Sequence, residues 1–144
     1  MSIENNIREP NYEMLVSAMA KRIVIRGENT KEFAEYAKKT LEELGPQTEV
    51  ENNLCEKYIF LNWKLRRSYE HERNLLSEQN SRLDSKDETE IYFGHKSGRR
   101  VRNIKRIDLS DPSVIYVTQQ QHELEKRISK TLDRFRAEQR KRKN

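Results

Sequence analysis

Apolar side chains recur at steps of three and four residues over a long stretch in the middle of the chain, residues 48–83. The stripe consists of Leu54, Tyr58, Leu61, Leu65, Tyr69 and Leu76. Cys55, Ile59 and Trp63 widen it over its first half. This spacing predicts one long helix with a broad buried face at first and a narrow one afterwards. The polar second half needs a partner along a narrow seam, either from this chain or from a second copy.

The start of this helix is sharply marked. Gly45 and Pro46 end the preceding segment, and Thr48 stands three residues before Glu51. That spacing predicts a capping box, in which each of the two side chains accepts a hydrogen bond from a backbone amide of the first turn. No further Gly or Pro occurs until Gly94.

Two shorter segments precede the long helix. The spacing of apolar residues over 12–21 predicts a short helix, and the β-branched run at residues 23–25 predicts a brief extended segment. Asn29 is placed to cap a second helix that ends at Gly45, a residue suited to a left-handed C-terminal cap. Its apolar face consists of Phe33, Tyr36, Ala37, Leu41 and Leu44. We expect this face to fold onto the first half of the long helix, with Phe33 and Leu41 near Leu54, Tyr58 and Ile59.

A last helix is predicted from Val114 or Thr118 to Lys141. Its narrow seam consists of Val117, Gln121, Leu124, Ile128, Thr131 and Phe135, close to the 3.5-residue period of a coiled coil. This seam suits antiparallel pairing with the long helix. Between them, residues 84–90 are predicted to be a charged linker. The region that follows is compatible with either a small hairpin or a flexible basic loop.

The predicted fold class is therefore all-α. We expect an elongated helical hairpin or three-helix arrangement around one long central helix, with a small irregular or hairpin insertion near residues 90–107. One helical domain is predicted over residues 12–139, with a basic insertion at 84–113. A flexible arm (residues 1–11) precedes it and a basic tail (residues 140–144) follows it.

Composition fits an extended helical protein, because 37% of the 144 residues are charged and only 33% are hydrophobic. The single Cys excludes an internal disulfide and favours a reducing compartment. No apolar run approaches the roughly 20 residues that span a bilayer. The first residues also lack the basic and then apolar pattern of a secretory leader. We expect a cytoplasmic protein without a membrane association.

The positive charge is concentrated in two windows. Residues 96–106 contain six basic side chains and no acidic one, and residues 134–144 contain six basic and one acidic. These windows carry +11 together while the whole chain carries +5, so the remainder carries −6. Such local clusters indicate a polyanionic partner, whereas the competing interpretation is that both windows are solvated ends that keep the chain soluble.

No arrangement of catalytic residues is visible. His71, His95 and His122 lack the spacing of metal ligands, and Cys55 has no His near it in sequence. Residues 94–98 resemble a phosphate loop only superficially, since the strand and helix of a Walker motif are missing. We therefore predict a protein that is not an enzyme and that uses no metal or cofactor.

The residues expected to contact nucleic acid are the basic side chains of the first window and of the tail that ends the second. Their cations would neutralise phosphates and release counterions, which gives affinity without sequence readout. They are Lys96, Arg99, Arg100, Arg102, Lys105 and Arg106 in the first window, with Arg140, Lys141, Arg142 and Lys143 in the second. Tyr92 and Phe93 precede the first window and suit stacking on unpaired bases.

Five short motifs stand out along the chain: Gly27-Glu28-Asn29, Glu32-Phe33, Gly45-Pro46, Trp63-Lys64-Leu65-Arg66-Arg67 and Leu124-Glu125-Lys126-Arg127. They resemble motifs of a group of short bacterial and phage-associated helical proteins without a known activity. The resemblance covers residues 18–76 and 119–139. It implies an all-helical fold and a phage or mobile-element context.

Two functions follow as hypotheses. The first is a non-catalytic accessory protein that binds DNA or RNA through the basic loop and tail. The second is a helical assembly or adaptor subunit that binds another protein, or itself, through a coiled-coil-like seam. The salt dependence of binding distinguishes the two hypotheses. The affinity of phosphate-driven binding falls steeply with ionic strength, whereas the affinity of a packed helical interface does not.

Overall fold

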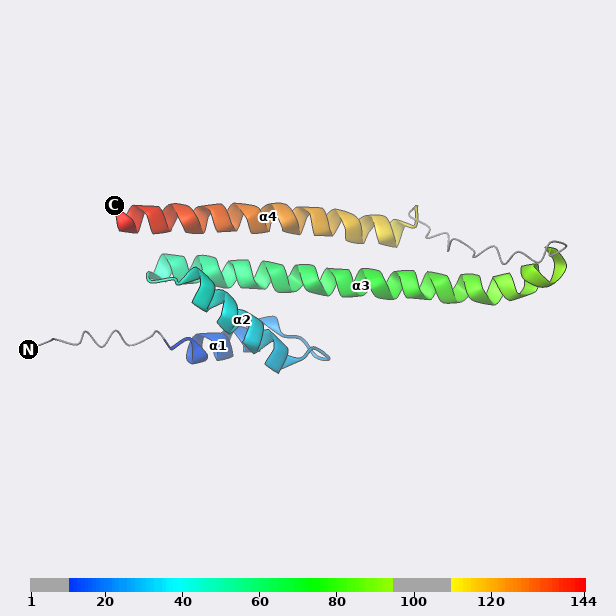
Figure 1. Ribbon diagram of the computed structural model, residues 1–144, viewed down its shortest axis with the longest axis horizontal. Helices are drawn as coiled ribbons and strands as arrows, with labels where there is room; N and C mark the ends of the chain where they lie inside the picture. Colours follow the sequence, from blue (N-terminus) through cyan, green and yellow to red (C-terminus); the bar gives the residue numbers. More distant parts are fainter. Residues whose placement is uncertain (1–10, 95–109) are drawn as a thin grey trace, which may run out of the picture. The chain divides into compact units, whose positions relative to one another are not determined.

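Within the residues that it describes, the computed structural model contains four helices: α1 (Glu13–Ile23), α2 (Thr30–Leu44), α3 (Glu49–Gly94) and α4 (Pro112–Lys143), coloured along the chain in Figure 1. The structure describes residues 11–94 and 110–144, with side chains described only up to residue 82 in α3. Every regular element in these ranges is a helix, so the all-α prediction is confirmed.

The predicted caps around the turn between α2 and α3 are present. The Asn29 side chain accepts hydrogen bonds from two amides of the first turn of α2. Gly45 ends that helix at φ 58°, a conformation that costs a glycine little. At α3, the Glu51 amide donates to Thr48 Oγ1 (3.1 Å) and the Thr48 amide donates to Glu51 Oε2 (3.4 Å). The capping box is therefore reciprocal, as predicted.

The later helix ends differ from the prediction. α3 continues through residues 84–90 to Gly94, so the predicted linker there is wrong, and residues 91–93 are helical rather than part of a hairpin. Charged residues do not end a helix, and the first residue that disfavours its continuation is Gly94. The rest of the predicted insertion, residues 95–109, lies outside the described residues.

α4 starts two residues before the earlier of its predicted starts. The Asp111 side chain accepts a hydrogen bond from the Ser113 amide (2.9 Å), which makes Asp111 the N-cap. Pro112 occupies the first helical position, where its fixed φ suits the helix and its missing amide costs nothing. The helix then extends to Lys143, two residues beyond its predicted end.

Contacts divide the chain into two compact units. Unit 1 comprises Met1–Trp63 with Ser129–Asn144, and unit 2 comprises Lys64–Ile128. α3 and α4 each contribute one segment to each unit. The predicted domain, residues 12–139, includes parts of both.

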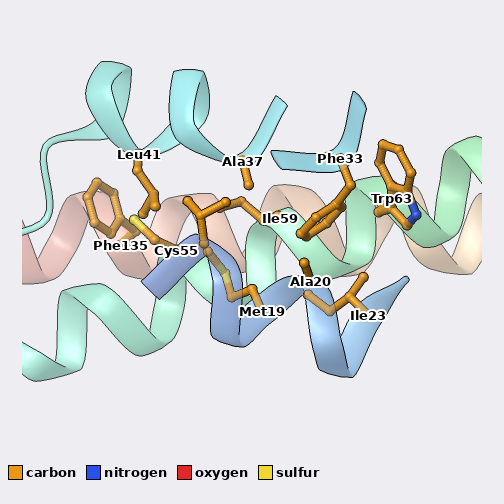
Figure 2. Close-up of a cluster of buried hydrophobic side chains, with 11 residues drawn as sticks. Met19, Ala20, Ile23, Phe33, Ala37, Leu41, Cys55, Ile59, Trp63 and Phe135 are labelled. Atoms are coloured by element: carbon orange, nitrogen blue, oxygen red, sulfur yellow. The ribbon is translucent and has the colours of Figure 1, made fainter. Parts of the chain in front are cut away.

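Unit 1 has a core to which all four helices contribute, as Figure 2 shows. Its buried side chains are Val16, Met19, Ala20, Ile23, Phe33, Ala37, Leu41, Cys55, Ile59, Trp63 and Phe135. Phe33 and Leu41 of α2 lie in one cluster with Ile59, and Leu54 packs at its edge. The expected packing of α2 on the first part of α3 is thus confirmed for Leu54 and Ile59, whereas Tyr58 is half-buried and lies outside the cluster.

Trp63 closes one end of this core. Its ring meets Phe33 edge-on at 5.0 Å and stacks on Tyr36 at 6.0 Å, measured between ring centroids. Its indole N–H donates to Glu28 Oε2 (3.0 Å), which also accepts from the Ile25 amide (3.0 Å). The predicted core position of Trp63 is confirmed, and its polar atom has the partner that a buried indole needs.

In unit 2, α3 and α4 run antiparallel. Cross-helix hydrogen bonds join Gln79 to Asp111, Glu72 to Gln121 and Tyr69 to Glu125. Their residue numbers fall along α3 as they rise along α4, which defines the direction. α4 buries Val114, Val117, Gln121 and Leu124 at the predicted three- and four-residue steps. On α3, none of the residues 64–82 is fully buried.

Candidate nucleic-acid interface

The structure describes only some of the residues that were predicted to contact nucleic acid. The first basic window lies outside the described residues: Lys96, Arg99, Arg100, Arg102, Lys105 and Arg106. Tyr92 and Phe93 belong to the last turn of α3, but their side chains also lie outside the described part. The second window is described completely, and it carries the geometry of the candidate interface.

The predicted basic tail is the last turn of α4. Arg140, Lys141, Arg142 and Lys143 are all helical. Four positive side chains at this end of a helix are favoured, because the carbonyl groups there carry partial negative charge. The cations are therefore held on a regular backbone rather than on a loose extension of the chain.

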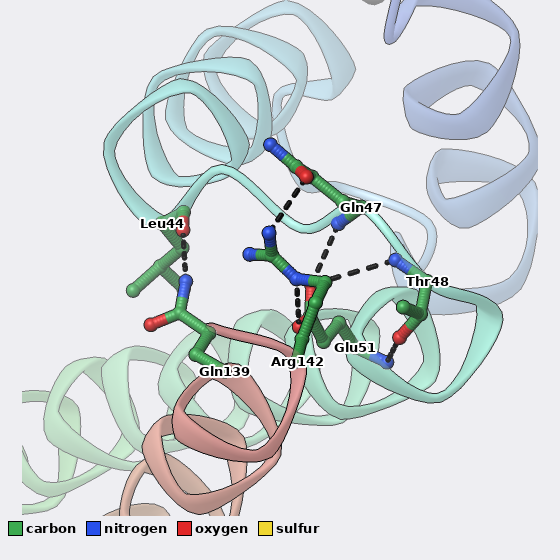
Figure 3. Close-up of polar contacts among 6 residues, drawn as sticks. All are labelled: Leu44, Gln47, Thr48, Glu51, Gln139 and Arg142. Atoms are coloured by element: carbon green, nitrogen blue, oxygen red, sulfur yellow. Dashed lines mark hydrogen bonds and ion pairs between the residues drawn. The ribbon is translucent and has the colours of Figure 1, made fainter. Parts of the chain in front are cut away.

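Arg142 connects this turn to the start of α3, as Figure 3 shows. Its Nε donates to Glu51 Oε1 (2.9 Å) and its guanidinium also donates to Gln47 Oε1 (2.7 Å). Glu51 is fully buried, and its other oxygen accepts from the amides of Gln47 (2.7 Å) and Thr48 (3.4 Å). Glu51 thus completes the cap of α3 and binds the end of α4 at the same time.

A second contact lies one turn earlier on α4. The Gln139 side-chain amide donates to the backbone carbonyl of Leu44 (2.9 Å), the last residue of α2. Carbonyl groups in the last turn of a helix lack partners within the helix, so this bond satisfies an acceptor that would otherwise need water. We call Gln139 and Arg142, with the groups they bind on Leu44, Gln47 and Glu51, the C-terminal clamp.

The charge on Glu51 is stabilised within the clamp. Burial alone would raise the pKa of its carboxyl group, because it disfavours the charged form. The hydrogen bonds from Arg142 and from the amides of Gln47 and Thr48 act in the opposite direction and outweigh it. The pKa of Glu51 is therefore held below its ordinary value, and the clamp is an ion pair at neutral pH.

Around the clamp, the last four turns of α4 present an exposed positive surface. Its cations are Lys130, Arg134, Arg136, Arg140, Lys141 and Lys143, which we call the basic face. Two acids, Asp133 and Glu138, lie in the same stretch, and Glu138 pairs with Lys141 at 3.0 Å. The buried Thr131 and Phe135 occupy the opposite side of the helix. The basic face can therefore meet a polyanion without disturbing the core.

Sequence reasoning missed two features of this region. It treated Arg142 as equivalent to its neighbours, whereas the structure engages it with Glu51. The signal is the seam spacing, which continues from Phe135 by steps of four and three to Gln139 and Arg142. It also left Lys130, Arg134 and Arg136 out of the contact set, although all three are exposed.

The described residues provide no group of three His, Cys, Asp or Glu that is placed to hold a metal ion. Cys55 is buried in the core of unit 1, and burial raises the pKa of its thiol to about 12. It is therefore protonated at neutral pH and is not a nucleophile. Across residues 11–94 and 110–144, none of the helices has the length and apolar character that crossing a membrane requires.

The chain matches no protein-family profile, no curated protein and no solved structure.

Proposed function

We propose that this is a cytoplasmic, non-catalytic nucleic-acid-binding accessory protein that contacts phosphates through the basic face. The observation that carries the proposal is the C-terminal clamp. It binds the last turns of α4 to the folded body of unit 1 while six neighbouring cations remain exposed. The motif resemblance adds a phage or mobile-element context.

A helical basic face suits a phosphate backbone for two reasons. Its cations are positioned before binding, so less conformational entropy is lost when they meet the ligand. Each neutralised phosphate also releases counterions, which supplies affinity independent of sequence. The basic window at residues 96–106 is proposed to add further contacts of the same kind.

The direct test is binding to labelled single- and double-stranded DNA and RNA across a salt series. One variant changes Arg134, Arg140, Lys141 and Lys143 to Ala, and another changes Arg99, Arg100, Arg102 and Lys105 to Ala. The matched control changes Lys31, Lys38 and Lys39, which are exposed on α2, to Ala.

We expect the native protein to bind with an affinity that falls steeply with salt. Each phosphate contact removed should lower the salt slope by about 0.9 for duplex DNA or about 0.7 for single strands. The control should retain most of the slope. Absence of binding by the native protein at low salt would overturn the proposal, and the preferred nucleic acid is read from the same assay.

A second candidate function is a helical adaptor or assembly subunit. The observation that favours it is the incomplete coverage of unit 2, where Ile115 and Tyr116 of α4 are 42% and 62% exposed. Exposed apolar side chains of this size suit a helical partner, either another protein or a second copy. Sedimentation velocity at high salt separates the candidates, since a packed interface should persist where phosphate contacts are screened.

A further inference from the structure

Unit 2 contains a groove that the basic face does not include. Its volume is about 350 Å³. Six side chains line it: Lys64, Arg67, Ser68 and His71 from α3, with Gln120 and Leu124 from α4. The α3 residues follow steps of three and four, which places them along one side of that helix.

The lining of this groove contains Lys64, Arg67 and His71 and no acidic side chain. Arg67 is engaged in an interaction of its own, so the group available to an anion is the Lys64 ammonium. Three carboxylates of the same unit are engaged by other groups: Glu70 by Arg66 (3.8 Å), Glu72 by Gln121 (2.8 Å) and Glu125 by Tyr69 (2.9 Å). Among the described residues, none supplies an ion-pair partner for Lys64 or His71. The groove therefore favours an anionic ligand.

The α4 side of the groove has a different chemistry. Leu124 is 4% exposed and supplies an apolar surface, while Gln120 is exposed and supplies an amide with both donors and an acceptor. Unpaired bases are recognised through this combination of a surface for the ring and a hydrogen-bonding group for its edge. The His71 imidazole adds a planar ring on which a base can stack.

The size of the groove restricts the ligand further. Its 350 Å³ lies at the lower end of the range for small-ligand pockets, roughly 300–1,000 Å³. That space suits one nucleotide, whose Watson–Crick edge is free to meet Gln120 in a single strand and is already paired in a double helix.

We propose that this groove binds one unpaired nucleotide of a single-stranded nucleic acid, with its phosphate at Lys64 and its base against the His71 imidazole. The inference rests on the proposed nucleic-acid-binding function and adds a preference for single strands. The basic face supplies affinity for any phosphate backbone, and the groove distinguishes single strands from duplexes.

The test compares two variants of the full-length chain. The groove variant carries Lys64→Gln and His71→Gln. The control variant carries Lys31→Gln and Lys38→Gln, two exposed lysines of α2 with the same seven-residue spacing. The control removes at least as much positive charge as the groove variant. The probes are a short labelled single-stranded DNA, its RNA counterpart and the corresponding DNA duplex.

We expect the groove variant to bind single strands about tenfold more weakly than the native protein, since one stacked base and one phosphate contact are lost. Its duplex affinity should change by less than about twofold, and the control should change by less than about twofold with every probe. A groove variant that matches the control with single strands overturns the groove proposal alone. A native protein that binds none of the probes overturns both this inference and the proposed function.

Discussion

The two units are built from segments of the same two long helices but are stabilised in different ways. In unit 1, α1 and α2 add a third and a fourth packing surface, so Phe33, Leu41 and Ile59 lose all contact with solvent. In unit 2, two helical segments meet along one narrow seam, and α3 has no fully buried side chain at residues 64–82. Buried apolar side chains from all four helices therefore stabilise unit 1, whereas among the described residues of unit 2 only α4 contributes fully buried ones.

This difference also distinguishes positions that stabilise the fold from positions that are available for binding. A fully buried apolar side chain contributes about 1.5–3 kcal/mol, so the core positions of unit 1 have little freedom to vary. The exposed and half-buried positions of unit 2 contribute less to stability and are available for binding. The lining of the groove, with Lys64 and His71 beside Leu124, is an example of this freedom.

The largest expected effect comes from removing a core side chain of unit 1. Phe33→Ala should lower the free energy of unfolding by about 3–5 kcal/mol, because it leaves a cavity among α1, α2 and α3. The matched change in unit 2 is Leu76→Ala, a half-buried position that should cost less than about 1.5 kcal/mol. Urea unfolding followed by circular dichroism measures both. Equal losses would contradict the distinction between the units.

The next largest effect concerns the C-terminal clamp. Arg142→Ala leaves the buried Glu51 carboxylate without its charged partner and should cost about 2–4 kcal/mol. The matched control is Lys143→Ala, which removes an exposed cation from the same turn and should cost less than about 0.5 kcal/mol.

A double variant sharpens this second prediction. Adding Glu51→Gln to Arg142→Ala removes the unpaired buried charge, so it should restore part of the lost stability. If the double variant is no more stable than Arg142→Ala, the loss arises from the packing of the arginine stem rather than from the ion pair.

The sequence predicted the caps and the core because those features are local. Thr48 and Glu51 lie three residues apart, and a left-handed turn at Gly45 depends on that residue alone. The burial of Ile59 and Phe135 follows from helical spacing. Short-range periodicity identifies the buried side of α2 and α4, whereas in α3 the fully buried Cys55, Ile59 and Trp63 lie beside the predicted main stripe.

The features that the sequence did not reveal depend on tertiary contacts or on helix propagation. Arg142 stands in a run of four basic residues, and only its contact with Glu51, 91 positions away, distinguishes it. The continuation of α3 through residues 84–90 was missed because charged composition was interpreted as a linker. A helix that has already formed extends through such residues at little cost, since each one adds a hydrogen bond.

A pH titration provides a further test of the clamp. The pKa of Glu51 is depressed in the folded protein, so its ionised form contributes stability at neutral pH. That contribution is complete above the pKa of the unfolded chain, about 4.3, and is lost as pH falls through the lower pKa of the folded state. Glu51→Gln should therefore flatten the acid side of the curve of unfolding free energy against pH. A variant with the native acid dependence would show that other carboxylates determine it.

The smallest expected effect is at a polar bond of unit 2. The Tyr69 hydroxyl donates to Glu125 (2.9 Å) at an exposed site, and its side chain is 44% accessible. Tyr69→Phe removes the hydroxyl and leaves the ring, so the cost should be about 0.5 kcal/mol or less, because water replaces the lost bond at both ends.

The matched change in unit 1 is Glu28→Ala, which removes the carboxylate that accepts from the indole N–H of Trp63 at 3.0 Å. That change should cost about 1–2 kcal/mol, since it removes a hydrogen bond made by a buried donor. Thermal unfolding of both variants measures the difference, and a Tyr69→Phe loss as large as that of Glu28→Ala would mean that the polar bonds of unit 2 are shielded from water as strongly as those of unit 1.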